Sequence, residues 1–469
     1  MLASFALAAS SGLAQTTIKG KVISAYDKTP VSGAVITILN TTKHVKTNPD
    51  GSFVLDAIEA GAKTLRIWSP GYYESKVAIL GRSEFEITLI GEGRDNYQNV
   101  LDGSFSIKNA ALLAATDYRL GAFTPEEALT GEMAGLRITN KSGMVSEGGQ
   151  ISFRGIRSFE ADNTPLMVID GVPFLPDASI SSTIGGYARS LLAPLNLHDI
   201  KSIRLLKGAD AARFGSLGAN GVLWLETSSS EDLETVIEFR GSYGVAHNYS
   251  TIPVLEGSSY KSLLGSVGMT QFEDMGELLL KFPFLRDDPN YYYKYLYNNA
   301  TDWQDVIYRN AFVTDNHLRI KGGDAIAKYD LSLGVLNQQG TLNHTANTRY
   351  STRLNSSIAL GRKFDLKASM GLTYSTGRIQ EQGILKASNP LLAALYRAPI
   401  LSTHRKDAQN NLLPDLDGVG EFGVSNPVAL LETSDFTNDI YDVFLHTNLG
   451  YQATDNLRFQ TQLGLFTNY

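Results

Sequence analysis

From residue 234 to the end of the chain, apolar and polar residues alternate in long runs. In the stretch "FDLKASMGLTYS" at 364–375, every second residue is apolar and the residues between are polar or glycine. The same alternation occurs at 329–335 and 457–465. A period of two predicts β-strands with one apolar and one polar face. Strands of ten or more residues with this division are typical of a transmembrane barrel with lipid outside and a polar lumen.

We expect seven such strands, and tyrosines near their ends predict an interfacial aromatic girdle. The strands are expected at 234–247, 313–323, 326–339, 347–360, 362–376, 438–452 and 455–468, and the tyrosines are Tyr350, Tyr374, Tyr441 and Tyr451. The sequence holds no run of about 20 apolar residues, the length that a membrane-spanning helix requires. Only a β-barrel is then expected to carry this chain across a membrane.

The first part of the chain, residues 17–90, alternates over much shorter segments such as "GAVITIL" and "KTLRIWS". Turn signals separate them, among them Asn48-Pro49-Asp50-Gly51. Short strands at this spacing predict a small β-sandwich. Residues 91–123 are less patterned and are interpreted as a linker.

A helix is expected directly after that linker. Thr124 is a suitable N-cap, Pro125 suits the first helical position, and two glutamates in the first turn are favoured by the helix dipole. The helix is expected to end at Gly135. Short strands and glycine-rich turns follow, including "MVIDGVPF", where Asp170-Gly171 predicts a turn.

Composition removes several classes of function. The chain has 469 residues, 43% hydrophobic and 19% charged, and a formal net charge of -7 without a basic cluster, which argues against nucleic-acid binding. It contains no cysteine, which excludes disulfides and thiolate chemistry and suits an oxidising compartment. The seven histidines are dispersed and form no zinc spacing or Ser-His-Asp order, so we expect no enzyme, metal or cofactor.

The N-terminus, "MLASFALAASSGLAQ", is a short apolar stretch followed by small residues, which predicts a signal peptide over 1–14. The usual positive residues before the apolar stretch are missing. Either the leader is longer than this sequence, or the stretch is only a small-residue N-terminus.

Several motifs together resemble a known family. The order "GKV…PVSGAVITILN" resembles the carboxypeptidase-regulatory-like domain. "GGQISFRGIRSF", "PLMVIDGVPF" and "IKSIRLLKGADAARFGSLGANGV" resemble the plug domain of SusC/RagA-type TonB-linked outer-membrane transporters. With "NPVALLE" at 426–432, the resemblance runs from residue 17 to the end.

The resemblance implies a mainly β fold with an immunoglobulin-like sandwich, an α+β plug and the first strands of an antiparallel transmembrane barrel. The expected units are a signal peptide over 1–14, the sandwich over 15–90, a linker over 91–123, the plug over 124–230 and a partial barrel over 231–469. Residues expected to form the turns and scaffold of the plug are Arg154, Gly155, Asp170, Gly171, Pro173, Gly215, Asn220 and Gly221.

The function implied is import of an oligosaccharide or peptide across the outer membrane, with the sandwich and plug reached from the periplasm. The implied partners are TonB with ExbB/ExbD, a SusD-like surface lipoprotein, outer-membrane lipid and the solute. A glycan-binding or adhesion protein that uses the plugged barrel as an anchor is an alternative. A signalling receptor is another, although such receptors carry a different domain at the front.

The loop at 174–193 is expected to lie under the solute site, where Phe174 and Tyr187 would offer flat faces and Asp177 and Arg189 polar contacts. Packing of the two aromatic residues against the barrel wall is the equal alternative. Four arginines are expected to pair with acids of the wall or within the plug: Arg154, Arg157, Arg204 and Arg213.

Two features depart from the family pattern. Plugged transporters close their barrel with 22 strands, so seven imply a reading frame that continues to about 1000 residues. The energy-coupling segment is not assigned, because "LIGEGRDNYQNVLDG" matches it poorly.

Overall fold

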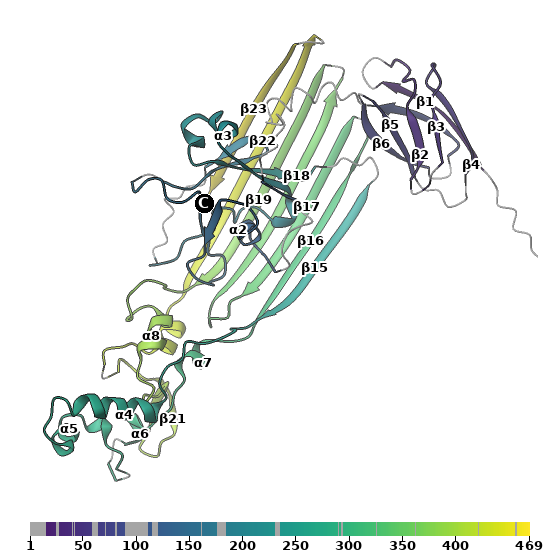
Figure 1. The fold of residues 1–469 in the computed structure, drawn as a ribbon. Helices are drawn as coiled ribbons and strands as arrows, with labels where there is room; N and C mark the ends of the chain where they lie inside the picture. The colour runs from purple at the N-terminus through teal and green to yellow at the C-terminus, as the bar shows by residue number, and fades with distance from the viewer. Residues whose placement is uncertain are drawn as a thin grey trace, which may run out of the picture.

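The computed structural model describes three units and the loops of the third (Figure 1). The described residues are 16–24, 28–39, 41, 43–58, 64–70, 72–79, 82–89, 111–114, 121–160, 162–175, 184–229, 235–288, 290–291, 294–324, 326–361, 363–420, 422–454 and 457–469. The predicted signal peptide lies outside them. Within these ranges, none of the helices has the length and apolar character needed to cross a membrane.

The first unit is a two-sheet sandwich with its own core. Its strands are β1 (Thr16–Ser24), β2 (Val35–Ile38), β3 (His44–Lys46), β4 (Ser52–Ile58), β5 (Thr64–Ser69), β6 (Tyr72–Ala78) and β7 (Glu84–Leu89). One sheet has the order β4-β1-β7 and the other β3-β2-β5-β6. Alternate residues such as Ile36, Leu65 and Phe53 are buried between the sheets, as the period-two pattern predicts.

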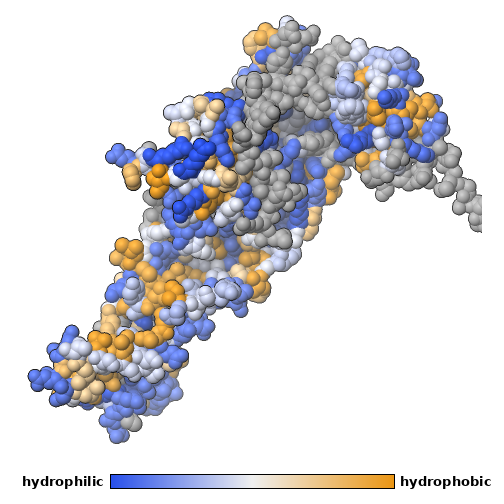
Figure 2. Space-filling model, viewed as in Figure 1, coloured by the Kyte–Doolittle hydropathy of each residue, from blue (hydrophilic) through white to orange (hydrophobic). Residues whose placement is uncertain are grey.

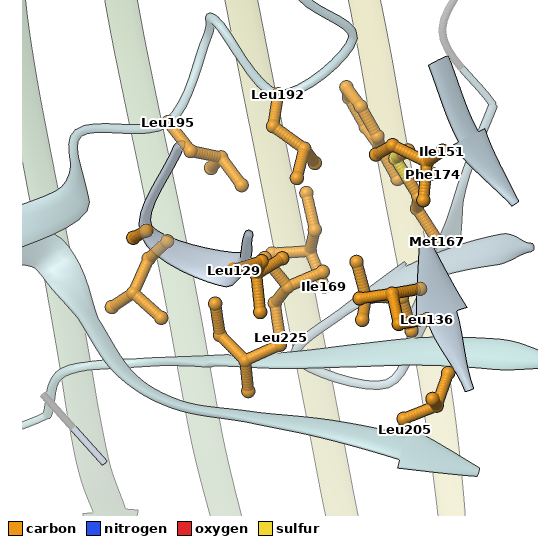
Figure 3. Packing of buried hydrophobic residues seen from close by; sticks show 14 of the residues in the cluster. Leu129, Leu136, Ile151, Met167, Ile169, Phe174, Leu192, Leu195, Leu205 and Leu225 are labelled. Carbon is orange, nitrogen blue, oxygen red and sulfur yellow. The ribbon is translucent and has the colours of Figure 1, made fainter. Parts of the chain in front are cut away.

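The central unit, residues 111–229, is built on a five-stranded sheet of order β12-β11-β14-β13-β8. Its strands are β8 (Ala111–Ala114), β9 (Leu136–Thr139), β10 (Gln150–Phe153), β11 (Leu166–Ile169), β12 (Val172–Phe174), β13 (Ile200–Leu206) and β14 (Val222–Thr227). Its helical elements are α2 (Pro125–Leu129), α3 (Ala209–Ala212) and the 3-10 turns η3 (Leu197–Asp199) and η4 (Gly215–Gly218). Figure 3 shows leucines of α2 and of the loops packed on the sheet residues Ile169 and Leu225.

Two details of the central unit differ from the sequence expectation. The helix α2 begins as predicted, with Thr124 and Glu127 forming a capping box, but ends at Leu129 rather than at Gly135. Thr130 is already extended, and Gly131 and Gly135 have φ of 81° and 88°, which no helix accepts. The strand β8 lies in the stretch interpreted as a linker and pairs with β13.

The third unit is a seven-stranded antiparallel sheet in chain order. Its strands are β15 (Val236–Ala246), β16 (Ala311–Gly323), β17 (Ala327–Gln339), β18 (Ala346–Leu360), β19 (Phe364–Ile379), β22 (Phe436–Thr454) and β23 (Leu457–Asn468). The seven predicted strands are confirmed, and β15 and β23 are the edges of this open sheet. We call the end at which β16 leads to β17, β18 to β19 and β22 to β23 the turn end, and the other the loop end.

The sheet has an apolar outer face and a polar inner face. On β19, Phe364 and Leu372 are 42% and 40% exposed, whereas Ser369 and Thr373 on the opposite face are buried. The central unit lies against the inner face (Figure 1). The arrangement is inverted relative to a soluble sandwich, whose apolar face would be the buried one, and it matches the predicted division between lipid and lumen.

Two long segments at the loop end, 247–310 and 380–435, form a small folded module. They contain α4 (Gly257–Gly268), α5 (Met275–Lys281), η5 (Pro283–Leu285), α6 (Lys294–Tyr297), α7 (Trp303–Ile307), α8 (Pro390–Tyr396), β20 (His404–Lys406), β21 (Leu412–Leu416) and α9 (Pro427–Thr433). An asparagine N-cap followed by proline starts both α8 and α9. Trp303, Ile400 and Leu431 are among the residues of the shared core.

Candidate functional site: the interface between the central unit and the long sheet

Buried charged side chains join the central unit to the inner face of the sheet. Asp199, at the end of η3, lies 3.0 Å from His317 Nε2 and 3.9 Å from Arg353 Nε. Burial alone would raise the pKa of Asp199, but the hydrogen bond to His317 and the charge of Arg353 outweigh it and lower that pKa. The carboxylate is therefore ionised at neutral pH and fixed to the long seven-stranded sheet, which we call the wall.

His198, the residue before Asp199, makes a second pair in which the central unit contributes the histidine and the sheet contributes the aspartate. His198 Nε2 lies 3.0 Å from Asp315 Oδ2, and the rings of His198 and His317 are 5.1 Å apart. Asp315 and His317 are two residues apart on β16 and therefore share its inner face. Each element thus contributes one histidine and one aspartate to two crossed His–Asp pairs.

A third charged contact lies on β22, in the same row of the strand register as His317. The guanidinium of Arg189 donates to both oxygens of Asp442 on β22, at 3.2 and 2.5 Å. Uncharged hydrogen bonds lie between these charged contacts. The Asn196 amide donates to the Ser351 hydroxyl at 3.0 Å, and the Thr373 hydroxyl donates to the Pro194 carbonyl at 2.9 Å.

Inside the central unit, Glu126 connects α2 to the segment that docks on the wall. Its Oε1 accepts hydrogen bonds from the Ser190 hydroxyl at 2.5 Å and the Leu192 amide at 3.0 Å. Its Oε2 accepts none from the described residues. Complete burial raises the pKa of Glu126, which favours a neutral carboxyl.

The loop after β19 fastens the same segment from outside. The Gly185 amide donates to Glu381 Oε2 at 2.9 Å, and the Gln382 amide donates to the Gly185 carbonyl at 2.9 Å. Ile184 and Tyr187, which flank this contact in the sequence, pack against Ile379. The segment 184–192 is therefore held by the loop-end module on one side and by α2 on the other.

The structure places three of the four predicted solute contacts at this interface. Phe174 is buried and meets Phe466 of β23 edge-on, with ring centroids 4.5 Å apart. Tyr187 is also buried, with its hydroxyl 3.2 Å from that of Ser146. This geometry favours the packing alternative for both rings. The guanidinium of Arg189 forms an ion pair with Asp442. Asp177 lies outside the described residues.

A cavity of about 20 Å³ lies between the central unit and the wall. Tyr187, Arg189, Asn347 and Arg349 are among its lining residues. A cavity of this volume has room for about one water molecule. A molecule larger than water can pass this interface only if the central unit moves relative to the sheet.

The four predicted arginines make contacts within the central unit. Arg204 pairs with Glu226 at 2.9 Å, and Arg157 donates to the Ala219 carbonyl at 2.6 Å. Arg154 lies over Phe153 and Arg213 over Trp224. The contacts with the wall come from His198, Asp199 and Arg189 instead, residues whose partners are more than a hundred positions away in the sequence.

The predicted scaffold residues lie at turns. Asp170 and Gly171 have φ of 49° and 88°, as a two-residue hairpin turn before Pro173 requires. The Asp170 carboxylate accepts hydrogen bonds from the Thr227 amide and hydroxyl at 2.8 and 2.7 Å. Positive φ also occurs at Arg154, Gly155, Gly215 and Gly221, and the Asn220 side chain donates to the Asp162 carbonyl at 2.7 Å.

Over the part of the chain that the structure describes, no group of three or more His, Asp or Glu side chains is arranged to hold a metal ion. The polar residues of the interface bind one another, so the arrangement holds two elements together and allows them to separate without breaking a covalent bond.

Comparisons with known proteins agree with this architecture. Residues 17–89 match the carboxypeptidase regulatory-like domain, and 111–222 match the TonB-dependent receptor plug domain. The chain is 27% identical to the TonB-dependent receptor SusC of Bacteroides thetaiotaomicron, over 78% of this chain and 34% of that protein. It is 24% identical to TonB-dependent receptor P3 of Formosa agariphila, over 96% of this chain and 42% of that protein.

Among solved structures, the RagAB peptide importer in its "open-open" state has a similar fold, with a TM-score of 0.63 at 18% identity. That match covers 77% of this chain and 40% of the importer chain. The chain thus spans about two fifths or less of the length of these relatives. All of them are named as receptors or importers, in agreement with the expectation that the chain is not an enzyme.

Proposed function

Because the chain belongs to the SusC/RagA-type TonB-dependent receptors, we propose that it forms the plug and part of the wall of an outer-membrane importer. The central unit is then the plug, and the long sheet is the wall. The observation that carries the proposal is a polar inner face closed by the plug and an apolar outer face exposed to the surroundings.

The outer face has the dimensions that a membrane requires. Tyr350, Tyr374 and Tyr441 stack across three strands near the loop end, and Phe364 stacks on Tyr451 at the turn end. On β19, Phe364 and Tyr374 are ten residues apart, about 33 Å along an extended strand. A strand tilt of about 40° reduces this to about 25 Å, the height of the apolar band of outer-membrane barrels.

The proposed orientation follows from the loops. Outer-membrane barrels have short periplasmic turns and long extracellular loops. The turn end would then face the periplasm and the loop-end module the outside of the cell. The first strand of the wall, β15, starts at the turn end. The chain that comes before it, with the sandwich and the plug, would therefore enter the wall from the periplasmic side.

Transport in this proposal is a displacement of the plug. Periplasmic TonB, energised through ExbB/ExbD, would pull on the chain ahead of the plug and break the contacts of Asp199, His198 and Arg189 with the wall. An oligosaccharide or peptide delivered by a SusD-like lipoprotein would then pass. Support for a peptide comes from the fold shared with the RagAB peptide importer. The oligosaccharide and the SusD-like partner follow from the family resemblance.

A cross-link between plug and wall tests the proposal. The 469-residue chain has no cysteine, so within it Asn196→Cys with Ser351→Cys introduces a single pair where the side chains now meet at 3.0 Å. In the intact transporter, oxidation should stop growth on oligosaccharides or peptides as sole nutrient, and a reductant should restore it. Outer-membrane abundance should not change.

The control joins two neighbouring wall strands on the outer face, away from the plug. Thr352→Cys with Leu372→Cys places the pair at positions that are directly opposite in the register. This pair should leave uptake intact when oxidised. Uptake that continues with the plug cross-linked would contradict the proposal and favour an adhesion protein anchored by a plugged barrel.

A further inference from the structure

The sandwich presents an ordered outer face on its four-stranded sheet. Alternation buries Ile36 and Ile67 and turns their neighbours outward. The strand register places Lys46, Val35 and Trp68 in one row across β3, β2 and β5. The adjacent row contains His44, Thr37, Arg66 and Lys76.

Trp68 is the unusual residue of this face. It is 47% exposed, whereas the two other tryptophans of the chain, Trp224 and Trp303, are 5% and 3% exposed. A tryptophan left open on a sheet face gives up most of the stabilisation that burial of its large ring would bring. The flat indole beside the half-buried Val35 is suited to the apolar face of a sugar ring.

A cationic side chain, Lys46, shares the row of the indole. Elsewhere on this face, among the described residues, Arg66 pairs with the acid Glu74 at 2.5 Å. Among the described residues, no acidic side chain lies within salt-bridge distance of Lys46. An anionic ligand therefore complements this face better than a neutral or cationic one.

We propose that this face binds an acidic amino-sugar glycan, with a pyranose ring over Trp68 and carboxylates near Lys46. Thr37 and Arg66 are the hydrogen-bonding neighbours in the next row. The inference rests on the proposed function, which places the sandwich in the periplasm. There the cell wall supplies N-acetylhexosamine strands whose peptide stems carry carboxylates. The bound sandwich would keep the transporter beside the peptidoglycan layer of the cell.

Tryptophan fluorescence gives a direct test. Soluble peptidoglycan fragments are added to the 469-residue chain in detergent, and quenching by acrylamide is measured. Trp68 supplies nearly all the quenching because the other two indoles are buried. Bound glycan should lower the quenching constant at least threefold. Trp68→Ala should weaken binding, measured by calorimetry, at least tenfold, and Lys46→Gln should weaken it about threefold.

Matched controls separate the site from general effects. Val54→Ala removes a 52% exposed side chain from the other sheet and should bind as the unchanged protein does. Trp68→Tyr keeps a flat ring and should retain most of the binding. Unchanged quenching in the presence of fragments, or full binding by Trp68→Ala, would overturn the proposal.

Two further outcomes concern the class of partner. Uncharged chitohexaose that binds as tightly as the fragments would overturn the acidic ligand. Photo-cross-linking from position 68 in cells that captures a protein and no glycan would overturn a glycan partner. Binding is measured on the isolated chain and does not require uptake, so a failure here leaves the import proposal standing, and a failed uptake test leaves this result standing.

Discussion

At the scale of single residues, Asp199 is the strongest connection between plug and wall. Its carboxylate is buried and shared by His317 and Arg353, so removal of its charge leaves a guanidinium without its acid in the interior. Removing one partner of a buried ion pair typically lowers the free energy of unfolding by about 3–5 kcal/mol. The crossed pair of His198 and Asp315 lies beside it and would not replace the lost charge.

We expect Asp199→Asn to destabilise the detergent-solubilised chain by about 3 kcal/mol at neutral pH, measured by chemical denaturation. The pKa of Asp199 is lowered in the folded chain, so its contribution is present above the ordinary carboxyl pKa of about 4. It is lost as the pH falls through the lowered value. The two proteins should therefore converge in strong acid.

The matched control is Asp50→Asn at an exposed position. Among the described residues, the Asp50 carboxylate accepts hydrogen bonds only from nearby Ser52. It should change stability by less than about 0.5 kcal/mol. Equal effects of the two substitutions at neutral pH would show that Asp199 does not hold the plug.

At the scale of elements, the turn between β11 and β12 ties the plug sheet together. Gly171 has φ of 88°, and a Cβ added there would lie 2.9 Å from the Gln462 amide nitrogen of β23. The turn also positions Asp170 to accept two hydrogen bonds from Thr227 on the adjacent strand. A change at Gly171 therefore affects the turn and the contact with the wall.

We expect Gly171→Ala to cost about 1–2 kcal/mol, because the left-handed backbone strains any residue with a side chain. Denaturant midpoints of the solubilised chain measure this loss. Gly143→Ala is the matched control, since an added Cβ there meets no atom within 4 Å and φ is not positive. An equal midpoint for the two variants would rule out strain at the turn.

Elements with a strict period could be predicted from the sequence, and contacts between distant residues could not. The seven wall strands and the start of α2 follow from alternation and capping, which are local properties. The strand β8 was missed because "ALLA" has no alternation and is recognised only by its partner β13. The pairs of His198 and Asp199 with β16 depend on how two units dock, for which neighbouring residues carry no signal.

At the scale of the whole molecule, plug and wall depend on each other whereas the sandwich does not. The plug core includes Phe444 of the wall, and wall residues such as Asp442 are buried by the plug. In Figure 2 the loop-end module carries apolar patches, and the sandwich lies to one side of the other units. The sandwich core, from Ile18 to Leu89, contains residues of no other unit.

This independence predicts that residues 15–90 fold when expressed alone. Among the described residues, fourteen buried apolar side chains on and beside the strands of the two sheets form one core. The unit should therefore unfold cooperatively in urea with β-type circular dichroism. Phe53→Ala should destabilise it by about 3–4 kcal/mol because the ring is fully buried, and a marginal unit of this size would then be largely unfolded. Val54→Ala, on the exposed face of the same strand, should change stability by less than about 0.5 kcal/mol. A non-cooperative transition in the unchanged fragment would show that the sandwich requires the plug or the wall for its stability.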